Sequence, residues 1–320
     1  MPVKGALHSG PARWQEIPAS PWHGGAVIWD SEPFGPCTPV RVRAADGARL
    51  VACPHGGQVV GWIPAGEDRD RLWLSPLARC GPGDAIRGGV PMVFPQFAGR
   101  GPLPKHGLAR DRAWELDTGT DGAPVARIVG HLRDDDATRA IWPHRFTLSL
   151  VAEATGRTLT LTLEARNDDP PGTPPLTLTA ALHSYLAVDA AQASVHGLGG
   201  ATAEDNAAGG ASVRVPDGAL PALGPRDLAV AGPRPVRIVD GAGGELLVDA
   251  TGDDGGEPGH HGFDSIVVWN PGDAHGLSDV PPDGARRFVC VEPARLVPVI
   301  LEPQGLWRAR ARLEALVPSS

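Results

Sequence analysis

The segment FTLSLVAEATGRTLTLTLEAR, residues 146–166, shows most clearly which kind of fold the chain adopts. Its second half alternates leucine with threonine, so Leu159, Leu161 and Leu163 share one face of an extended chain. Successive side chains of a β-strand point to opposite faces of a sheet, so this alternation predicts a strand with one buried face. Gly156 separates the two alternating halves and suits a tight turn. The segment therefore predicts an antiparallel β-hairpin.

Similar short alternating or apolar runs recur along the chain and are separated by glycine and proline. The 42 glycines and 34 prolines are spread over the whole sequence, as expected for many short strands joined by turns. Further strands are predicted at 40–43, 48–53, 58–63, 125–130, 176–188, 236–239, 245–249, 265–269, 287–292, 297–301 and 306–313.

Two parts of the chain lack such a pattern. Residues 189–235 are rich in glycine, alanine and proline and are predicted to form long connections, and a short helical turn is allowed near 309–316. Residues 1–39 contain seven prolines and no periodicity, which predicts an N-terminal extension whose scattered tryptophans pack on the domain. We therefore predict an all-β protein, with residues 40–320 forming one large antiparallel, twisted β-sandwich.

Composition narrows the classes of function. The chain has 320 residues, 42% of them hydrophobic, a formal net charge of −8 and a sequence pI of about 5.7. An acidic protein is a poor match for nucleic acid or for an anionic membrane surface, so neither is expected as a partner. We find no apolar run long enough to cross a bilayer and no signal-peptide pattern at the N-terminus. A cytoplasmic protein, acting as a monomer on a small molecule, is the expectation.

The cysteines and histidines give no metal-binding pattern. Cys37, Cys53, Cys80 and Cys290 show no CxxC spacing, so we interpret them as buried apolar side chains or free thiols in a reducing compartment. The adjacent pair at 260–261 would point to opposite faces of an extended strand, which is unsuited to a shared ligand. No metal and no cofactor are predicted.

The stretch IRGGVPMVFPQF (86–97), followed by KHGLAR (105–110), differs from the strands around it. It combines glycine and proline with large apolar residues, so it is irregular and yet wants burial, which is typical of functional segments. Its polar side chains suggest an anion site beside a titratable group. The alternative is a packed loop whose arginines are solvated or pair with nearby aspartates. The polar side chains in question are Arg87, Gln96, Lys105, His106 and Arg110.

Together with LWLSPLA (72–78), ALHSYLAV (181–188), DSIVVWNP (264–271) and FVCVEPA (288–294), this stretch resembles the hexose-6-phosphate mutarotase family. That family of glucose-6-phosphate 1-epimerases belongs to the larger group of aldose 1-epimerases. Five motifs in the family's order are far more specific than any one of them. The resemblance implies a galactose mutarotase-like supersandwich and an isomerase that needs neither metal nor cofactor.

Mutarotation opens the sugar ring, turns C1 and closes the ring on the other face, so it needs one base and one acid. The resemblance implies Glu292 as the base and His183 as the acid. Glu292 is expected at the end of an apolar strand, before Pro293, where partial burial would raise its pKa. Alternation places His183 on a small, polar strand face. The competing interpretation is that both side chains simply reach water.

The same resemblance implies the substrate contacts. Arg87 and Arg110 match positions that hold the phosphate, and His106 matches a residue near the reacting oxygens. Asp264 matches an aspartate that accepts sugar hydroxyls, although a turn-initiating aspartate is a real competitor. Lys105 stands where relatives have glutamine, which weakens the case for a particular sugar phosphate. Gln96 is taken as a further substrate contact.

We therefore expect an enzyme that interconverts the anomers of a hexose 6-phosphate, with glucose 6-phosphate as the first candidate. Two alternatives stay open at this point. One is an aldose 1-epimerase that acts on unphosphorylated sugars, and the other is a carbohydrate-binding β-sandwich without catalysis. The presence of both His183 and Glu292 favours an enzyme.

Overall fold

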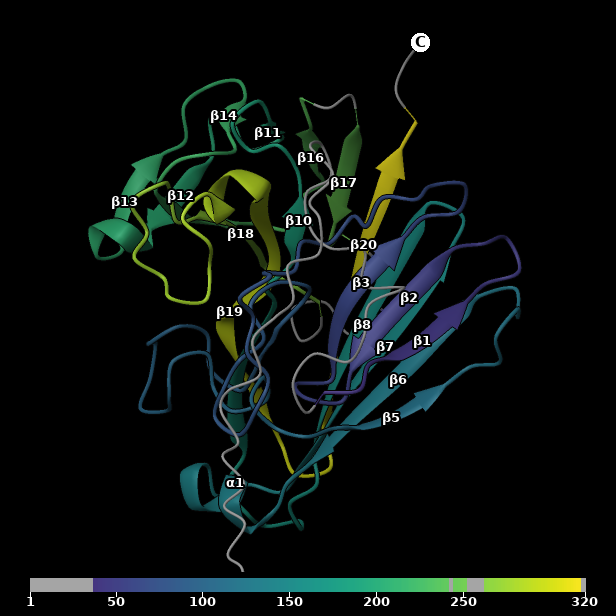
Figure 1. Ribbon diagram of the computed structural model, residues 1–320. Helices are drawn as coiled ribbons and strands as arrows, with labels where there is room; N and C mark the ends of the chain where they lie inside the picture. The colour runs from purple at the N-terminus through teal and green to yellow at the C-terminus, as the bar shows by residue number, and fades with distance from the viewer. Residues whose placement is uncertain (1–36, 242–243, 252–261, 318–320) are drawn as a thin grey trace, which may run out of the picture.

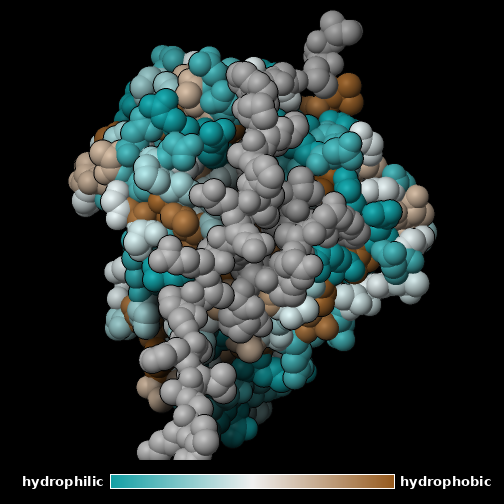
Figure 2. All heavy atoms as spheres, viewed as in Figure 1, coloured by the Kyte–Doolittle hydropathy of each residue, from teal (hydrophilic) through white to brown (hydrophobic). Residues whose placement is uncertain are grey.

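The computed structural model describes residues 37–241, 244–251 and 262–317 (Figure 1). The predicted N-terminal extension, with its tryptophans, lies outside these residues except for positions 37–39, and so does the histidine pair at 260–261. Within the described ranges, no helix has both the length and the apolar character that a membrane span requires. On the face drawn in Figure 2, hydrophilic side chains cover most of the described surface and hydrophobic ones form small separate patches.

The larger of two main sheets has nine strands in the order β14-β11-β16-β17-β20-β8-β7-β6-β5. The predicted hairpin at 146–166 is its centre, with Leu150 opposite Leu163 and Leu163 opposite Ala309. The strands are β5 (Glu115–Thr118), β6 (Ala126–Arg133), β7 (Phe146–Thr155), β8 (Thr158–Asn167), β11 (Ser194–His196), β14 (Leu220–Pro221), β16 (Val236–Val239), β17 (Glu245–Asp249) and β20 (Leu306–Leu316).

The second main sheet has eight strands in the order β13-β12-β15-β18-β19-β9-β4, with β10 paired to β19. Its strands are β4 (Met92–Val93), β9 (Leu176–Leu182), β10 (Tyr185–Ala187), β12 (Thr202–Asp205), β13 (Ala211–Arg214), β15 (Arg226–Ala231), β18 (Ser265–Asn270) and β19 (Phe288–Leu301). A third, three-stranded sheet contains β1 (Val40–Arg43), β2 (Arg49–Cys53) and β3 (Gln58–Ile63), and it contacts β6 and β7.

The two main sheets form the predicted sandwich because each buries its apolar face in a shared core. Leu159, Leu161 and Leu163 of β8 are fully buried in one cluster with Leu178 of β9 and Val291 of β19. The all-β antiparallel architecture is therefore confirmed. The opposite face of the eight-stranded sheet is left to carry the polar groups described below.

Several local predictions were wrong. Residues 189–235 contain β11, β12, β13, β14 and β15 instead of long connections, and 309–316 belong to β20. A short helix, α1 (Asp136–Ile141), was not predicted. It starts at a capping box in which Asp135 accepts from the Thr138 N–H and the Thr138 hydroxyl side chain accepts from the Asp135 N–H. The helix and the strands between 189 and 235 are too short to show a clear period.

We expected the strand that carries Glu292 to end at that residue, and this expectation was wrong for β19. It continues through Pro293, which pairs with Ile266 of β18 on one side. On its other side β19 pairs first with β10 and then with β9, and the gap between those two strands falls opposite Pro293. The missing proline N–H therefore costs no ladder hydrogen bond, so a proline is tolerated inside the sheet.

The cysteines need a second correction. Cys37 and Cys80 form a disulfide, whereas Cys53 and Cys290 are free and buried as predicted. The paired cysteines are 43 residues apart in sequence, and the loop that carries Cys80 folds back against the start of β1. Spacing along the chain could not reveal this pairing.

Candidate functional site

The site is centred on a pair of residues that face each other across two strands of the eight-stranded sheet. Tyr185 lies opposite Cys290, and Ala181 lies opposite Ala294. Between these two pairs His183 faces Glu292, with its Nδ1 3.3 Å from the Glu292 Oε1. A break between β9 and β10 lets the His183 N–H bond to the Pro91 carbonyl instead of continuing the ladder.

Both members of this pair are buried, and burial sets their protonation. His183 is 8% exposed and Glu292 only 1%. Burial, followed by the charge of Asp227, raises the pKa of Glu292 well above its usual value. Burial, followed by His106, Arg87 and Arg110, lowers the pKa of His183 well below its usual value. Burial therefore favours the neutral form of both side chains, in which Glu292 and not His183 carries the extra proton.

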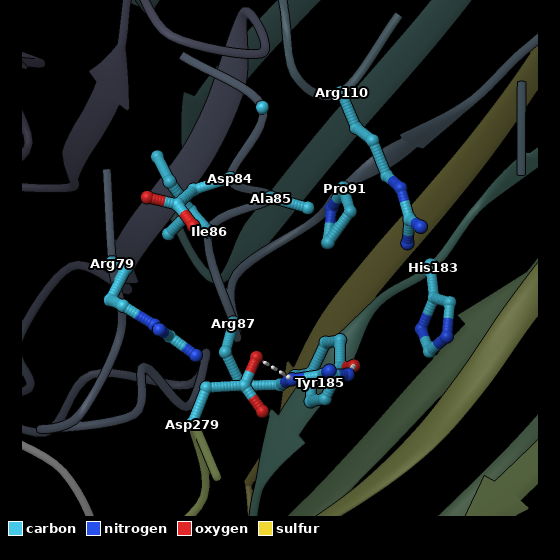
Figure 3. Close-up of a pocket in the computed structure, with 11 residues that line it drawn as sticks. Arg79, Asp84, Ala85, Ile86, Arg87, Pro91, Arg110, His183, Tyr185 and Asp279 are labelled. Carbon is cyan, nitrogen blue, oxygen red and sulfur yellow. Dashed lines mark hydrogen bonds and ion pairs between the residues drawn. The ribbon is translucent and has the colours of Figure 1, made fainter. Parts of the chain in front are cut away.

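A cavity of about 200 Å³ opens beside His183 (Figure 3). In this view the guanidinium of Arg110 points toward the His183 ring, and that of Arg87 lies against Tyr185. Three arginines and two aspartates give the lining one surplus positive charge while His183 is neutral, so the cavity suits an anion. The charged lining residues are Arg79, Asp84, Arg87, Arg110 and Asp279.

Arg87 is fixed by two contacts. Its Nε donates to the Asp279 Oδ2 at 3.0 Å, and its Nη1 donates to the Tyr185 hydroxyl at 2.8 Å. The Tyr185 ring is stacked on the His183 ring with centroids 4.9 Å apart. Asp279 and Tyr185 therefore hold the guanidinium at the cavity wall next to the His183–Glu292 pair.

His106 reaches the site through a strained turn. It adopts a positive φ of 67°, and Gly107 follows at 75°. A side chain at position 107 would collide with the Phe94 carbonyl, so glycine is required there. This turn brings the His106 ring to within 5.8 Å of the His183 ring, measured between centroids.

The hydrogen bonding and charge around His106 fix its protonation. Burial, then Arg110, Lys105 and Arg87, lower the pKa of His106 to about 3, so the ring is neutral near pH 7. The Ala98 N–H donates to its Nδ1 at 3.4 Å, which leaves the proton on Nε2. His106 is therefore a neutral hydrogen-bond donor.

Arg110 and Lys105 flank this turn in different ways. The Arg110 Nη2 donates to the Lys105 carbonyl at 3.2 Å, and Arg110 lines the cavity. Lys105 is exposed and its side chain is not part of the lining. It nevertheless acts on the site through its charge, because it contributes to the lowered pKa of His106.

Two predicted site residues are used elsewhere. The Asp264 carboxylate accepts from the N–H groups of Leu296 (2.8 Å) and Val297 (2.9 Å), where β19 bulges. The Gln96 amide bonds to Leu103 in both directions and to the Ala98 carbonyl, and so shapes its own loop. The structure therefore places neither side chain at the cavity.

Comparisons with known proteins show the family to which the chain belongs. The profile of the aldose 1-epimerase family matches residues 40–217. Proteins named "Putative glucose-6-phosphate 1-epimerase" are 34% identical to this chain over 245 residues in Salmonella typhimurium and over 252 residues in Escherichia coli. These alignments cover 74% and 75% of this chain and 76% and 77% of the relatives.

The chain belongs to the aldose 1-epimerase family. It is therefore an isomerase of the mutarotase type. The crystal structure of a "putative mutarotase" from Salmonella typhimurium superposes with a TM-score of 0.71 at 29% identity, covering 84% of this chain and 87% of the other. A galactose mutarotase related enzyme from Lactobacillus acidophilus shares the fold with a TM-score of 0.66 at 14% identity, covering 88% and 99%.

In this aldose 1-epimerase two further side chains lie near the His183–Glu292 pair, and one of them, Asp227, was not predicted from the sequence. Asp227 of β15 is half-buried and acts on the pKa of Glu292 through its charge. Trp269 of β18 lies opposite Asp227 and presents its ring edge to His183, with centroids 5.7 Å apart. Asp227 was missed because its segment was predicted to be a connection. A strand prediction for RDLAVA (226–231) could have pointed to it.

Two groups of described residues in this aldose 1-epimerase could in principle hold a metal ion. They are Cys37, Cys53 and Cys80, and His183, Cys290 and Glu292, each with ligand atoms within 4.8 Å of one another. Two of the first three cysteines are engaged in the disulfide. The second group contains the His183–Glu292 pair.

Proposed function

We propose that this protein interconverts the α and β anomers of a hexose 6-phosphate, with glucose 6-phosphate as the first candidate. The observation that carries the proposal is the cavity beside His183, which has guanidinium groups from Arg79, Arg87 and Arg110 in its walls. Guanidinium forks match phosphate oxygens in geometry and charge. The names of the bacterial relatives point to the same substrate class.

His183 and Glu292 supply both proton transfers. In the forward direction one of them removes the proton from the C1 hydroxyl while the other protonates the ring oxygen, and the exchanged roles close the ring. The expected roles, Glu292 as base and His183 as acid, require the shared proton to lie on His183 when the ring opens. Burial alone favours Glu292 as the residue that carries this proton.

A bound phosphate offers a reason for the proton to move. Arg87 and Arg110 both lower the pKa of His183, and an anion held between them would offset their positive charge. Phosphate binding would then raise the pKa of His183 and favour an ionised Glu292 beside a protonated His183. The substrate would thus prepare the acid and the base that its own reaction needs.

Other residues hold the sugar ring. The neutral His106 donates from Nε2 to a sugar oxygen near the reacting centre. Asp227, in place of Asp264, accepts sugar hydroxyls, because its carboxylate is half-buried and close enough to Glu292 to affect its pKa. Trp269 forms a flat apolar wall against the ring.

A second candidate function is the same reaction on free aldoses. It is favoured by one observation, which is that Arg87 already has a carboxylate partner in Asp279. A guanidinium that is neutralised by a half-buried carboxylate has less charge to offer to phosphate. Under this alternative Arg110 would hydrogen-bond neutral hydroxyls.

The decisive measurement is the rate of NMR exchange between the anomers of glucose 6-phosphate, after subtraction of the uncatalysed rate. Glucose and galactose serve as comparisons at equal concentrations. Under the proposal, kcat/KM is highest for the phosphorylated sugar. Faster exchange of the free sugars would favour the second candidate, and catalysis of none of the three would refute both.

A further inference from the structure

Asp227 does not stand alone at the edge of the site. The Asn206 Nδ2 donates to the Asp227 Oδ1 at 2.7 Å, and the Arg100 Nη2 donates to the Asn206 Oδ1 at 2.8 Å. Arginine can only donate and an ionised carboxylate can only accept. One orientation of the Asn206 amide satisfies both neighbours, so the three side chains form a directed relay.

The relay joins three separate parts of the chain. Arg100 lies on the loop that leads from Phe97 to His106, and Asn206 starts the 3₁₀ helix η2 (Asn206–Ala208) between β12 and β13. Asp205 accepts from the N–H groups of residues 207 and 208, which fixes the backbone of η2. The relay therefore links the position of the loop between Phe97 and His106 to the position of the Asp227 carboxylate.

Arg100 has two further contacts that anchor it. It forms an ion pair with the Glu204 Oε1 at 2.8 Å, and its guanidinium carbon lies 5.6 Å from the centroid of the Phe97 ring. The loop from Phe97 to His106 is thus fastened across to β12. The same loop presents His106 to the site, so one set of contacts positions groups on both sides of the sugar.

We propose that Asn206, oriented by Arg100, is a positioning residue that aims the Asp227 carboxylate at the sugar and ties it to the loop that carries His106. The inference rests on the proposed function, because it assigns Asp227 to the substrate. It goes beyond that function in naming two residues that touch neither the acid–base pair nor the phosphate cavity.

The charges around Asp227 explain why the contact matters. Burial raises the pKa of Asp227, and the hydrogen bond from Asn206 is the strongest influence that lowers it. Lys105 and Arg100 also lower this pKa, and Asp205 raises it. Glu292 lies on β19, which β18 separates from the Asp227 strand, and the Asp227 charge raises the pKa of Glu292. Loss of the Asn206 donor would make Asp227 harder to ionise and therefore a poorer acceptor of sugar hydroxyls.

The test compares Asn206→Ala, Asn206→Asp and Arg100→Gln with Arg127→Ala, a control that removes an exposed ion pair on β6. We expect Asn206→Ala to lower kcat/KM by about 10- to 100-fold, mainly through KM, as for loss of a hydrogen bond to a charged group. The acid limb of the kcat/KM pH profile of this variant should move to higher pH by about one unit. Asn206→Asp keeps an acceptor for Arg100 but places a second negative charge beside Asp227. The acid limb of its kcat/KM pH profile should therefore move to still higher pH.

A readout that does not depend on turnover separates this inference from the proposed function. The ¹³C NMR titration of the Asp227 carboxyl, assigned with Asp227→Asn, should shift to higher pH in Asn206→Ala and stay unchanged in the Arg127→Ala control. An unshifted titration overturns the inference even if the enzyme is active. A shifted titration in a protein that catalyses no anomer exchange supports the relay and refutes the proposed function alone.

Discussion

The His183 Nδ1 lies 3.3 Å from the Glu292 Oε1, and both side chains are removed from water. Glu292 lies in β19, and His183 lies in the short break between β9 and β10, both of which pair with β19, so the sheet fixes the separation of the two residues. The sheet thus holds a carboxyl and an imidazole side by side at a fixed distance. Under the proposed function, one of them accepts a proton from the sugar while the other donates one.

Replacement of either member should remove most of the catalysed rate. Glu292→Gln keeps the side-chain shape, and both Glu292→Gln and His183→Asn remove one proton carrier. Each should therefore lower kcat by about 10²- to 10⁴-fold. NMR exchange at saturating substrate measures this loss. Near wild-type exchange in either variant would show that the assignment is wrong.

The pH dependence of kcat/KM should differ from that of an enzyme whose activity depends on a histidine with the usual pKa. Burial raises the pKa of Glu292 and lowers that of His183, so the one-proton form persists over the range between them. At low pH, activity is lost when Asp227 is protonated and can no longer accept from sugar hydroxyls, or when His183 gains a second proton for the pair. We therefore expect kcat/KM at low substrate concentration to keep its acid limb well below 6.5, the usual histidine pKa. A limb near 6.5 would contradict a desolvated pair.

The cavity arginines should act mainly on binding. A phosphate remote from C1 does not change during the reaction, so its contacts contribute to ground state and transition state alike. Arg87→Ala and Arg110→Ala should each cost roughly 1.5–3 kcal/mol, seen as about a 10- to 150-fold rise in KM for the sugar phosphate. Free glucose should respond little. Equal losses on both sugars would mean that these arginines maintain the loop and do not bind phosphate.

Replacement of Asp227 and replacement of Asp264 should change different properties of the protein. Asp227→Asn is expected to raise KM with little change in stability, since its carboxylate faces the site. Asp264→Asn should instead lower the free energy of unfolding by roughly 1.5–3 kcal/mol, because Asp264 accepts from two backbone N–H groups of β19. Urea unfolding and steady-state kinetics on the two variants measure both quantities. The reverse pattern would restore Asp264 as the sugar ligand.

The disulfide should stabilise the fold through its loop. Cys37 and Cys80 enclose a long loop, with a sequence separation of 43, so Cys37→Ser should lower the free energy of unfolding by about 4 kcal/mol in the chain-entropy model. The double variant with Cys80→Ser should lose no more, because either change removes the same bond. Denatured, unreduced protein should show two free thiols. Four free thiols would refute the bond.

The sequence alone determined the all-β class and most strand positions. The alternation at 158–163 requires a two-residue period, and a strand provides that period whatever lies around it. The motifs around Arg87, His106, His183 and Glu292 also indicated the family, because their order is a property of the chain itself. The family profile and the bacterial relatives confirm that interpretation.

The tertiary structure decided which residues meet. Asp227 is near Glu292 because β15, β18 and β19 are neighbours in one sheet, and that order cannot be deduced from alternation. Asp264 is drawn away by a bulge in β19, and Cys80 is brought to Cys37 by a loop. Local periodicity is encoded in neighbouring residues, whereas strand order and register depend on burial summed over the whole sandwich. The Arg100–Asn206–Asp227 relay, which joins three distant segments, therefore becomes visible only in the folded chain.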